Sequence, residues 1–185
     1  MPAAQKGKDD VIQHLAGVFR RHGYDGATLT MLSDATGLVK ASLYHYFPNG
    51  KQDMARAVLD YLGELSKSEV LDKIDYAGDP RRELNALCER LVHYFQQGQV
   101  SCILEVFTLG QAKGLFQDTI AARMSRIAEA YARLLQRAGI AESVAQQRGW
   151  EALVTIEGAL VVTRATGDTK LFRNMMMALP TRILK

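Results

Sequence analysis

Apolar positions recur every three to four residues along most of the chain, which is the period of an amphipathic helix. No segment keeps the two-residue alternation typical of a half-buried strand. Prolines at positions 2, 48, 80 and 180, together with several glycines, divide the pattern into segments. We therefore predict an all-α protein with about nine helices, over residues 9–21, 29–36, 39–47, 51–73, 80–97, 103–109, 116–138, 144–165 and 169–180.

Side chains at the predicted helix ends indicate how the short N-terminal helices begin and stop. The Thr28 hydroxyl can accept from the free amides of the helix that follows it, and Gly37 can close that helix. Further along the chain we predict two capping boxes, formed by Asn49 with Gln52 and by Ser143 with Gln146.

The second and third helices, joined at Gly37, form a predicted helix-turn-helix. Val39, Leu43 and Phe47 are spaced by four and should share the buried face of the third helix. The other faces carry hydrogen-bond donors and one small side chain, which suit the major groove of duplex DNA, about 12 Å wide. The predicted DNA contacts are Thr28, Lys40, Ala41, Ser42, Tyr44, His45, Tyr46 and Lys51.

The same segment carries a family resemblance. Phe19, Gly23, Tyr24 and Thr28, followed by residues 35–47 and Lys51, resemble the DNA-binding domain of the TetR family of transcriptional repressors. The resemblance covers roughly residues 8–60. It implies an all-helical homodimer whose C-terminal domain binds a small molecule and then releases DNA, and it aligns the eight predicted contacts with positions that usually touch DNA. We therefore divide the chain into a DNA-binding domain, 1–52, and a ligand-binding and dimerisation domain, 53–185. Residues 101–105 are similar to a segment of the LmrA/YxaF-like regulators.

Val39 departs from the family pattern, which commonly has Ser or Thr at this helix start. Loss of a capping hydroxyl typically costs about 1 kcal/mol. We expect packing of Val39 against the first two helices to offset that loss.

Aromatic and isolated polar residues in the C-terminal part are candidates for an effector site, because such sites are mostly apolar with a few polar groups. Glu105 and Glu157 each lie in a long stretch without other charges, and a buried carboxylate is costly unless it is paired. The alternative is that all of these residues are ordinary core or structural groups. The candidate ligand-binding residues are Tyr61, Phe95, Cys102, Glu105, Phe107, Trp150 and Glu157.

The helix predicted at 144–165 carries apolar residues on more than one side, which one subunit core cannot cover. We predict that it forms a two-fold four-helix interface with the last helix. The alternative is a central helix buried within one subunit. The candidate interface residues are Val154, Gly158, Val161, Met175 and Leu179.

Composition adds limits. Apolar residues make up 48% and charged residues 23% of the 185, as in ordinary globular proteins, and the net charge of +3 does not identify a nucleic-acid partner. No stretch has the 18 or so apolar residues of a membrane span. Two cysteines and no signal-like opening favour the cytoplasm. We find no nucleophile and base pair, phosphate loop or metal-ligand spacing, so we expect no enzyme activity, cofactor or metal.

Together these features predict a ligand-responsive repressor. A homodimer would bind an inverted-repeat operator, with the two third helices about 34–36 Å apart, and a small, hydrophobic effector would release it. The alternative is a helical small-molecule-binding protein without a role in DNA regulation.

Overall fold

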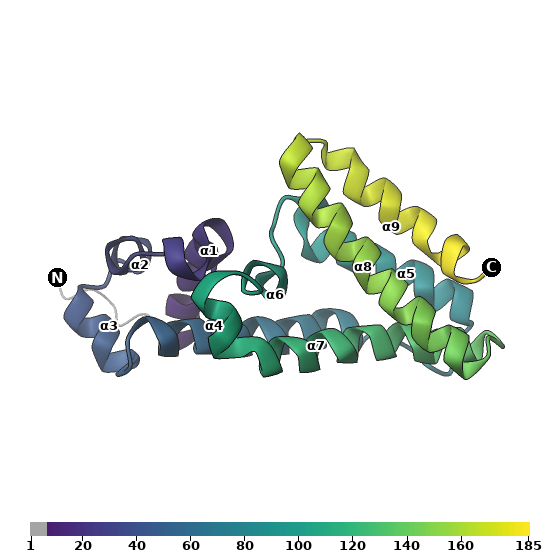
Figure 1. Ribbon diagram of the computed structural model, residues 1–185, viewed down its shortest axis with the longest axis horizontal. Helices are drawn as coiled ribbons and strands as arrows, with labels where there is room; N and C mark the ends of the chain where they lie inside the picture. Colours follow the sequence, from purple (N-terminus) through teal and green to yellow (C-terminus); the bar gives the residue numbers. More distant parts are fainter. Residues whose placement is uncertain (1–6) are drawn as a thin grey trace. The chain divides into compact units, whose positions relative to one another are not determined.

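The computed structural model describes residues 7–185, and the elements assigned within them are all helices and turns (Figure 1). The all-α prediction is confirmed. The nine α-helices of this described part are α1 (Lys8–Gly26), α2 (Leu29–Thr36), α3 (Lys40–Tyr46), α4 (Lys51–Ser66), α5 (Pro80–Tyr94), α6 (Ile103–Val106), α7 (Gly110–Arg137), α8 (Glu142–Thr166) and α9 (Thr169–Ile183). A π-helical turn, Lys67–Leu71, continues α4, and a 3-10 turn, Gln96–Gly98, follows α5.

The chain packs as two units. The N-terminal unit comprises the residues up to Glu64 and returns to the chain at Ile103–Gln117, whereas the C-terminal unit comprises Leu65–Cys102 and Asp118–Lys185. These packing units do not coincide with the predicted functional domains, 1–52 and 53–185. The division into functional domains stays a prediction.

An aromatic cluster explains why residues 103–117 belong to the N-terminal unit. The Phe107 ring lies edge-on to Phe19, with 5.6 Å between ring centroids, and it stacks on Phe116 at 5.7 Å. The Tyr24 ring meets Phe116 at 6.1 Å. All four side chains are buried. Aromatic rings bury large apolar areas and gain further from these edge and stacked geometries, so the cluster holds the distant segment against α1.

The first turn of α4 differs from its predicted capping box. The backbone N–H of Asn49 donates to the Asp53 carboxylate at 2.8 Å, and the Asn49 side-chain amide donates to the same group at 3.1 and 3.2 Å. Asp53, and not Gln52, therefore makes the contact with Asn49, and its carboxylate accepts from both the backbone N–H and the side-chain amide of Asn49. The prediction for Gln52 is wrong.

The capping box predicted for α8 is also wrong. The helix begins at Glu142, after Ala141, which supplies no side-chain cap. Ser143 already lies inside the helix, so its hydroxyl has no free first-turn amide to satisfy in the predicted way.

α7 begins six residues before the predicted start at Phe116. Gly110 adopts a left-handed backbone conformation, φ +58°, and the next residue, Gln111, donates its backbone N–H to the Asp25 carboxylate at 3.0 Å. Asp25 comes from the end of α1, 86 residues away in the chain. This distant cap lets the helix start at a glycine that local sequence marks as a break.

In the C-terminal unit, α9 packs along α8 and against α5 (Figure 1). Its buried side chains, Phe172, Met176 and Leu179, form much of the core with Leu153 and Leu160 of α8. No helix in the part of the chain that the structure describes is long and apolar enough to cross a membrane.

Candidate nucleic-acid interface

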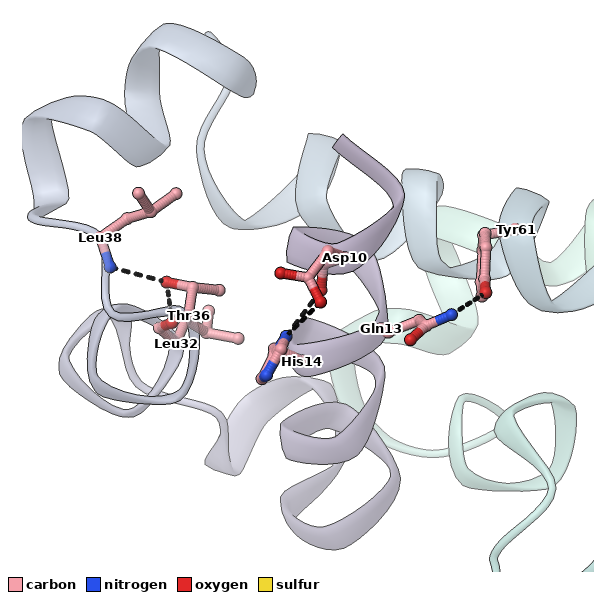
Figure 2. Close-up of polar contacts among 7 residues, drawn as sticks. All are labelled: Asp10, Gln13, His14, Leu32, Thr36, Leu38 and Tyr61. Carbon is pink, nitrogen blue, oxygen red and sulfur yellow. Dashed lines mark hydrogen bonds and ion pairs between the residues drawn. The ribbon is translucent and has the colours of Figure 1, made fainter. Parts of the chain in front are cut away.

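The turn between α2 and α3 is fixed by hydrogen bonds of the Ser33 and Thr36 side chains, and Figure 2 shows those of Thr36. Thr36 is fully buried, and its hydroxyl donates to the Leu32 carbonyl at 2.9 Å while accepting from the Leu38 N–H at 3.3 Å. The Ser33 hydroxyl donates to the Leu38 carbonyl at 2.6 Å. Gly37, with φ +68°, ends α2 in the left-handed conformation. The orientation of α3 relative to α2 is therefore closely defined.

The start of α2 agrees with its prediction. The Thr28 hydroxyl accepts the Met31 N–H at 3.2 Å, and the Thr28 side chain is otherwise exposed. The predicted cap is confirmed, and the same hydroxyl remains at the surface beside α2.

α3 presents one buried and one open side. Leu43 and Phe47 are buried against the rest of the N-terminal unit. Lys40, Ala41, Tyr44 and His45 are exposed, and Ser42 and Tyr46 are half-buried. The structure thus brings together, on one short helix, the six predicted contacts that lie between positions 40 and 46.

Tyr44 is exposed yet has a defined backing. A Cβ added at Gly50 would lie 3.1 Å from the Tyr44 ring, so the ring rests against the backbone that leads into α4. This support orients an otherwise free aromatic side chain on the open side of α3.

The expected packing of Val39 is wrong. Val39 is 68% exposed, and it makes no capping hydrogen bond. Its backbone is extended, with ψ 153°, so it lies before the first helical residue and the four-residue spacing does not align it with Leu43 and Phe47. Neither a side-chain cap nor burial compensates at this position.

Lys51 lies at the start of α4, as predicted, but its ammonium group has partners within the unit. Its Nζ donates to the Tyr24 carbonyl at 3.0 Å and to the Ala27 carbonyl at 3.3 Å, and it lies 4.5 Å from the centre of the Tyr24 ring. Lys51 therefore connects the start of α4 to the segment between α1 and α2. A contact with phosphate would have to use the remaining donor or replace one of these bonds.

The candidate ligand residues fall into both units instead of one site. Tyr61, Glu105 and Phe107 belong to the N-terminal unit, where the Tyr61 hydroxyl accepts from the Gln13 side chain (Figure 2). Phe107 is fully buried in the aromatic cluster of the N-terminal unit, and its role in ligand binding stays a prediction. In the C-terminal unit, Phe95 and Cys102 are buried, Glu157 is half-buried and Trp150 is 47% exposed.

Trp150 lies in a surface groove of about 490 Å³ on α8 and the end of α9, which also includes Gln147, Glu151, Val154, Thr155 and Arg182. Of the candidate interface residues, Val154 and Val161 are 69% and 41% exposed, and a Cβ added at Gly158 would meet no atom within 4 Å. Met175 is half-buried. Leu179 is only 1% exposed within the single subunit, so it belongs to the core and its assignment to a surface is wrong.

Cys88 and Tyr131 form a buried polar pair between α5 and α7. Desolvation raises the pKa of the Cys88 thiol to about 12, although the hydrogen bond with Tyr131 acts in the opposite direction. Burial also raises the pKa of the Tyr131 hydroxyl, and the neighbouring thiol adds to the rise. Both groups are neutral at physiological pH, so Cys88 lacks the thiolate that reactive cysteines need.

Asp25 is the residue that sequence analysis missed. It caps α7 through Gln111, and a Cβ added at Gly110 would lie only 1.8 Å from its carboxylate oxygen. Local sequence holds no signal for this contact, because the two partners are joined only by the tertiary fold.

Comparison with known proteins identifies the family. Residues 12–58 match the model for bacterial regulatory proteins of the tetR family, and residues 80–178, more than half of the chain, match the C-terminal domain of LmrA/YxaF-like transcriptional regulators. The chain belongs to the TetR family. It is therefore a transcriptional regulator with a DNA-binding helix-turn-helix, not an enzyme, and the resemblance of residues 101–105 to the LmrA/YxaF-like subgroup is confirmed.

Among its relatives, this TetR-family chain is 25% identical over 165 residues to the regulator YxaF of Bacillus subtilis, covering 87% of this chain and 86% of the relative. It is 23% identical over 167 residues to LmrA of the same organism, covering 84% and 85%. A TetR regulator from Legionella pneumophila has the same fold, with a TM-score of 0.82, 15% identity and coverage of 97% and 98%. A cysteine mutant of the TetR-family regulator CifR, complexed with 26-bp operator DNA, matches with a TM-score of 0.75, 22% identity and coverage of 100% and 98%.

Proposed function

We propose that this chain is a ligand-responsive repressor, which binds an inverted-repeat operator as a homodimer and releases it when a small, hydrophobic effector binds. The observation that carries the proposal is the open side of α3, where four polar or small side chains are exposed on a helix anchored by Leu43 and Phe47. A helix oriented by a hydrogen-bonded turn and exposed along one side suits the major groove.

Within this proposal the α3 residues divide into two groups. Exposed Lys40 and His45 have donors that reach phosphates or base edges, and Ala41 allows close approach to a thymine methyl group. Ser42, Tyr44 and Tyr46 offer hydroxyl groups to phosphate oxygens, as does Thr28 at the start of α2. Lys51 supports the same surface from α4, through its bonds to the Tyr24 and Ala27 carbonyls.

The homodimer is supported by the exposed apolar residues of α8. Val154 and Val161 are exposed whereas the adjacent Leu153 and Leu160 are buried, and Gly158 leaves room for a second helix to approach closely. Covering such a surface with a symmetric copy would remove apolar area from water on both subunits.

The effector site belongs to the C-terminal unit in this proposal. Buried Phe95 and Cys102 and half-buried Glu157 support a mostly apolar site with one acidic group. Coupling between such a site and the operator is typically 1–3 kcal/mol, which changes operator affinity roughly 5–150-fold.

The decisive test is selection of duplexes from a random DNA pool by the purified protein, followed by affinity measurements on the selected sequence. We expect an inverted repeat whose half-site centres are about one helical turn apart. His45→Ala should reduce the preference for the selected sequence over random duplex by roughly tenfold. His93→Ala, an exposed histidine on α5, is the matched control and should keep the preference.

Two results would contradict the proposal. If the purified protein enriches no duplex at low salt, the result favours the alternative that it is a helical protein that only carries a small molecule. If no hydrophobic compound that binds the protein changes its affinity for the selected operator, the proposed effector response is wrong, although the proposed DNA binding remains supported.

A further inference from the structure

Val39 is the most exposed of the large apolar side chains on the helix-turn-helix. It is 68% exposed, whereas the apolar residues that anchor α3, Leu43 and Phe47, are almost completely buried. Its neighbours Lys40 and Ala41 are exposed as well. An isopropyl group thus stands at the start of the helix that the proposed function places in the major groove.

The fold itself gives no use for this side chain. Val39 accepts helix hydrogen bonds from the Ser42 and Leu43 amides through its backbone carbonyl, which any residue could do. Its side chain caps no amide and packs into no core. A serine or threonine would serve the helix better at this position. The isopropyl group therefore serves a surface contact or none.

The position of Val39 decides which contact is available. The N-terminal residues of a recognition helix are those that reach base edges. Among the four bases, only thymine presents an apolar group in the major groove, its C5-methyl, whereas the other edges present donors and acceptors that valine cannot satisfy.

We propose that Val39 is a specificity-determining residue, which contacts the C5-methyl group of a thymine in each operator half-site. The inference rests on the proposed function, because it requires α3 to enter the major groove. It goes beyond that function by assigning a thymine contact to Val39, which is not among the predicted DNA contacts. Val39 then favours thymine by covering its methyl group and not by any hydrogen bond.

The test replaces thymine by uracil, which removes only the C5-methyl group. Each thymine of the selected operator is changed in turn, symmetrically in both half-sites, and affinity is measured for the wild type and for Val39→Ala. Burying one methyl group changes an equilibrium constant by about fourfold. We expect one position at which the wild type loses about fourfold for each half-site, and at which the loss for Val39→Ala falls to about twofold or less.

Two further variants isolate the contact. Val144→Ala removes the same atoms from a valine of α8 that is 39% exposed, and it should keep the wild-type response to uracil. Val39→Ser removes the methyl groups but can cap α3, so it should fold at least as stably as the wild type and still lose the response. A folding defect would therefore not imitate the expected result.

The outcomes distinguish this inference from the function on which it rests. If Val39→Ala responds to uracil at every position as strongly as the wild type, the contact is absent and only the inference fails. If no duplex is selected at all, both fail. Loss of the response in Val39→Ala and Val39→Ser, but not in Val144→Ala, supports the contact.

Discussion

Lys51, which is predicted to contact DNA, also makes hydrogen bonds within the N-terminal unit. Its ammonium group lies 3.0 and 3.3 Å from the Tyr24 and Ala27 carbonyls, so it joins the start of α4 to the end of α1 inside the N-terminal unit. A hydrogen bond from a charged donor contributes about 1.5–3 kcal/mol when it is sheltered, and less where water competes. We predict that Lys51→Ala lowers the free energy of unfolding by about 1–2 kcal/mol, measured by urea denaturation.

Lys40 is the matched control for that prediction, because its side chain is exposed. Lys40→Ala should change stability by less than about 0.5 kcal/mol, while reducing the salt dependence of DNA binding by about one unit of slope. Equal stability of the two variants would mean that the carbonyl contacts of Lys51 contribute nothing, and that phosphate binding alone accounts for its position.

The buried thiol of Cys88 makes stability depend on pH in the alkaline range. The pKa of the thiol is about 12 in the folded protein and 9.0 as its ordinary value. Above pH 9 the unfolded chain therefore loses a proton that the folded chain keeps, and the free energy of unfolding falls by up to about 1.4 kcal/mol per pH unit until pH 12. Urea unfolding at pH 8 and pH 10 measures this effect: the free energy of unfolding should decrease less between these pH values for Cys88→Ala than for the wild type. An identical decrease in both proteins would mean that another group, such as Tyr131, causes the pH dependence.

Among the helices, α7 depends most visibly on a tertiary contact for where it begins. Gly110→Ala would place a methyl group 1.8 Å from the Asp25 carboxylate oxygen, at a residue with φ +58°, so the cap on Gln111 must be displaced. We predict a loss of about 1–3 kcal/mol in the free energy of unfolding, from the strained backbone and the lost cap. Thermal or urea unfolding measures it.

Gly114 provides the control in the same helix. An added Cβ there meets no atom within 4 Å, and its backbone φ is not positive. Gly114→Ala should therefore stabilise the protein by up to about 1 kcal/mol through helix propensity. If both alanine variants changed stability in the same direction and by the same amount, the contact between Asp25 and α7 would not explain the start of the helix.

The helices themselves could be predicted from sequence because their signals are local. The three- to four-residue spacing of apolar positions predicted the all-α fold. Thr28 and Gly37 define the ends of α2 through contacts within four residues. The errors arose where a partner was distant or two local choices competed. The start of α7 depends on Asp25 of α1, and Asp53 competes with Gln52 for the Asn49 amide.

The candidate interface was predictable to the same extent. The exposed side of α3 follows from the spacing of Leu43 and Phe47, whereas the exposure of Val39 depends on where the helix begins, which the four-residue pattern does not define. The ligand residues were least predictable, because sequence position cannot indicate that residues 103–117 pack with the N-terminal unit.

For the whole molecule, the proposed function requires a dimer, because one copy of α3 reads only one half-site. The surface that we propose for that dimer is the exposed side of α8, which includes the groove with Trp150 and Val154, 47% and 69% exposed, and also Val161, 41% exposed. Val154→Glu would place a carboxylate at the most exposed apolar side chain of this groove. Burying an unpaired carboxylate costs several kcal/mol, whereas leaving it in water in a monomer costs little.

We therefore predict that the wild type sediments as a dimer at micromolar concentration, whereas Val154→Glu sediments as a folded monomer. Operator affinity should fall by at least 100-fold, because the two half-sites are then bound independently. Leu115→Glu, which changes an exposed leucine of the N-terminal unit, introduces the same charge outside the proposed interface residues and should not change the oligomeric state. A Val154→Glu variant that stays dimeric and keeps its operator affinity would contradict this assignment of the interface.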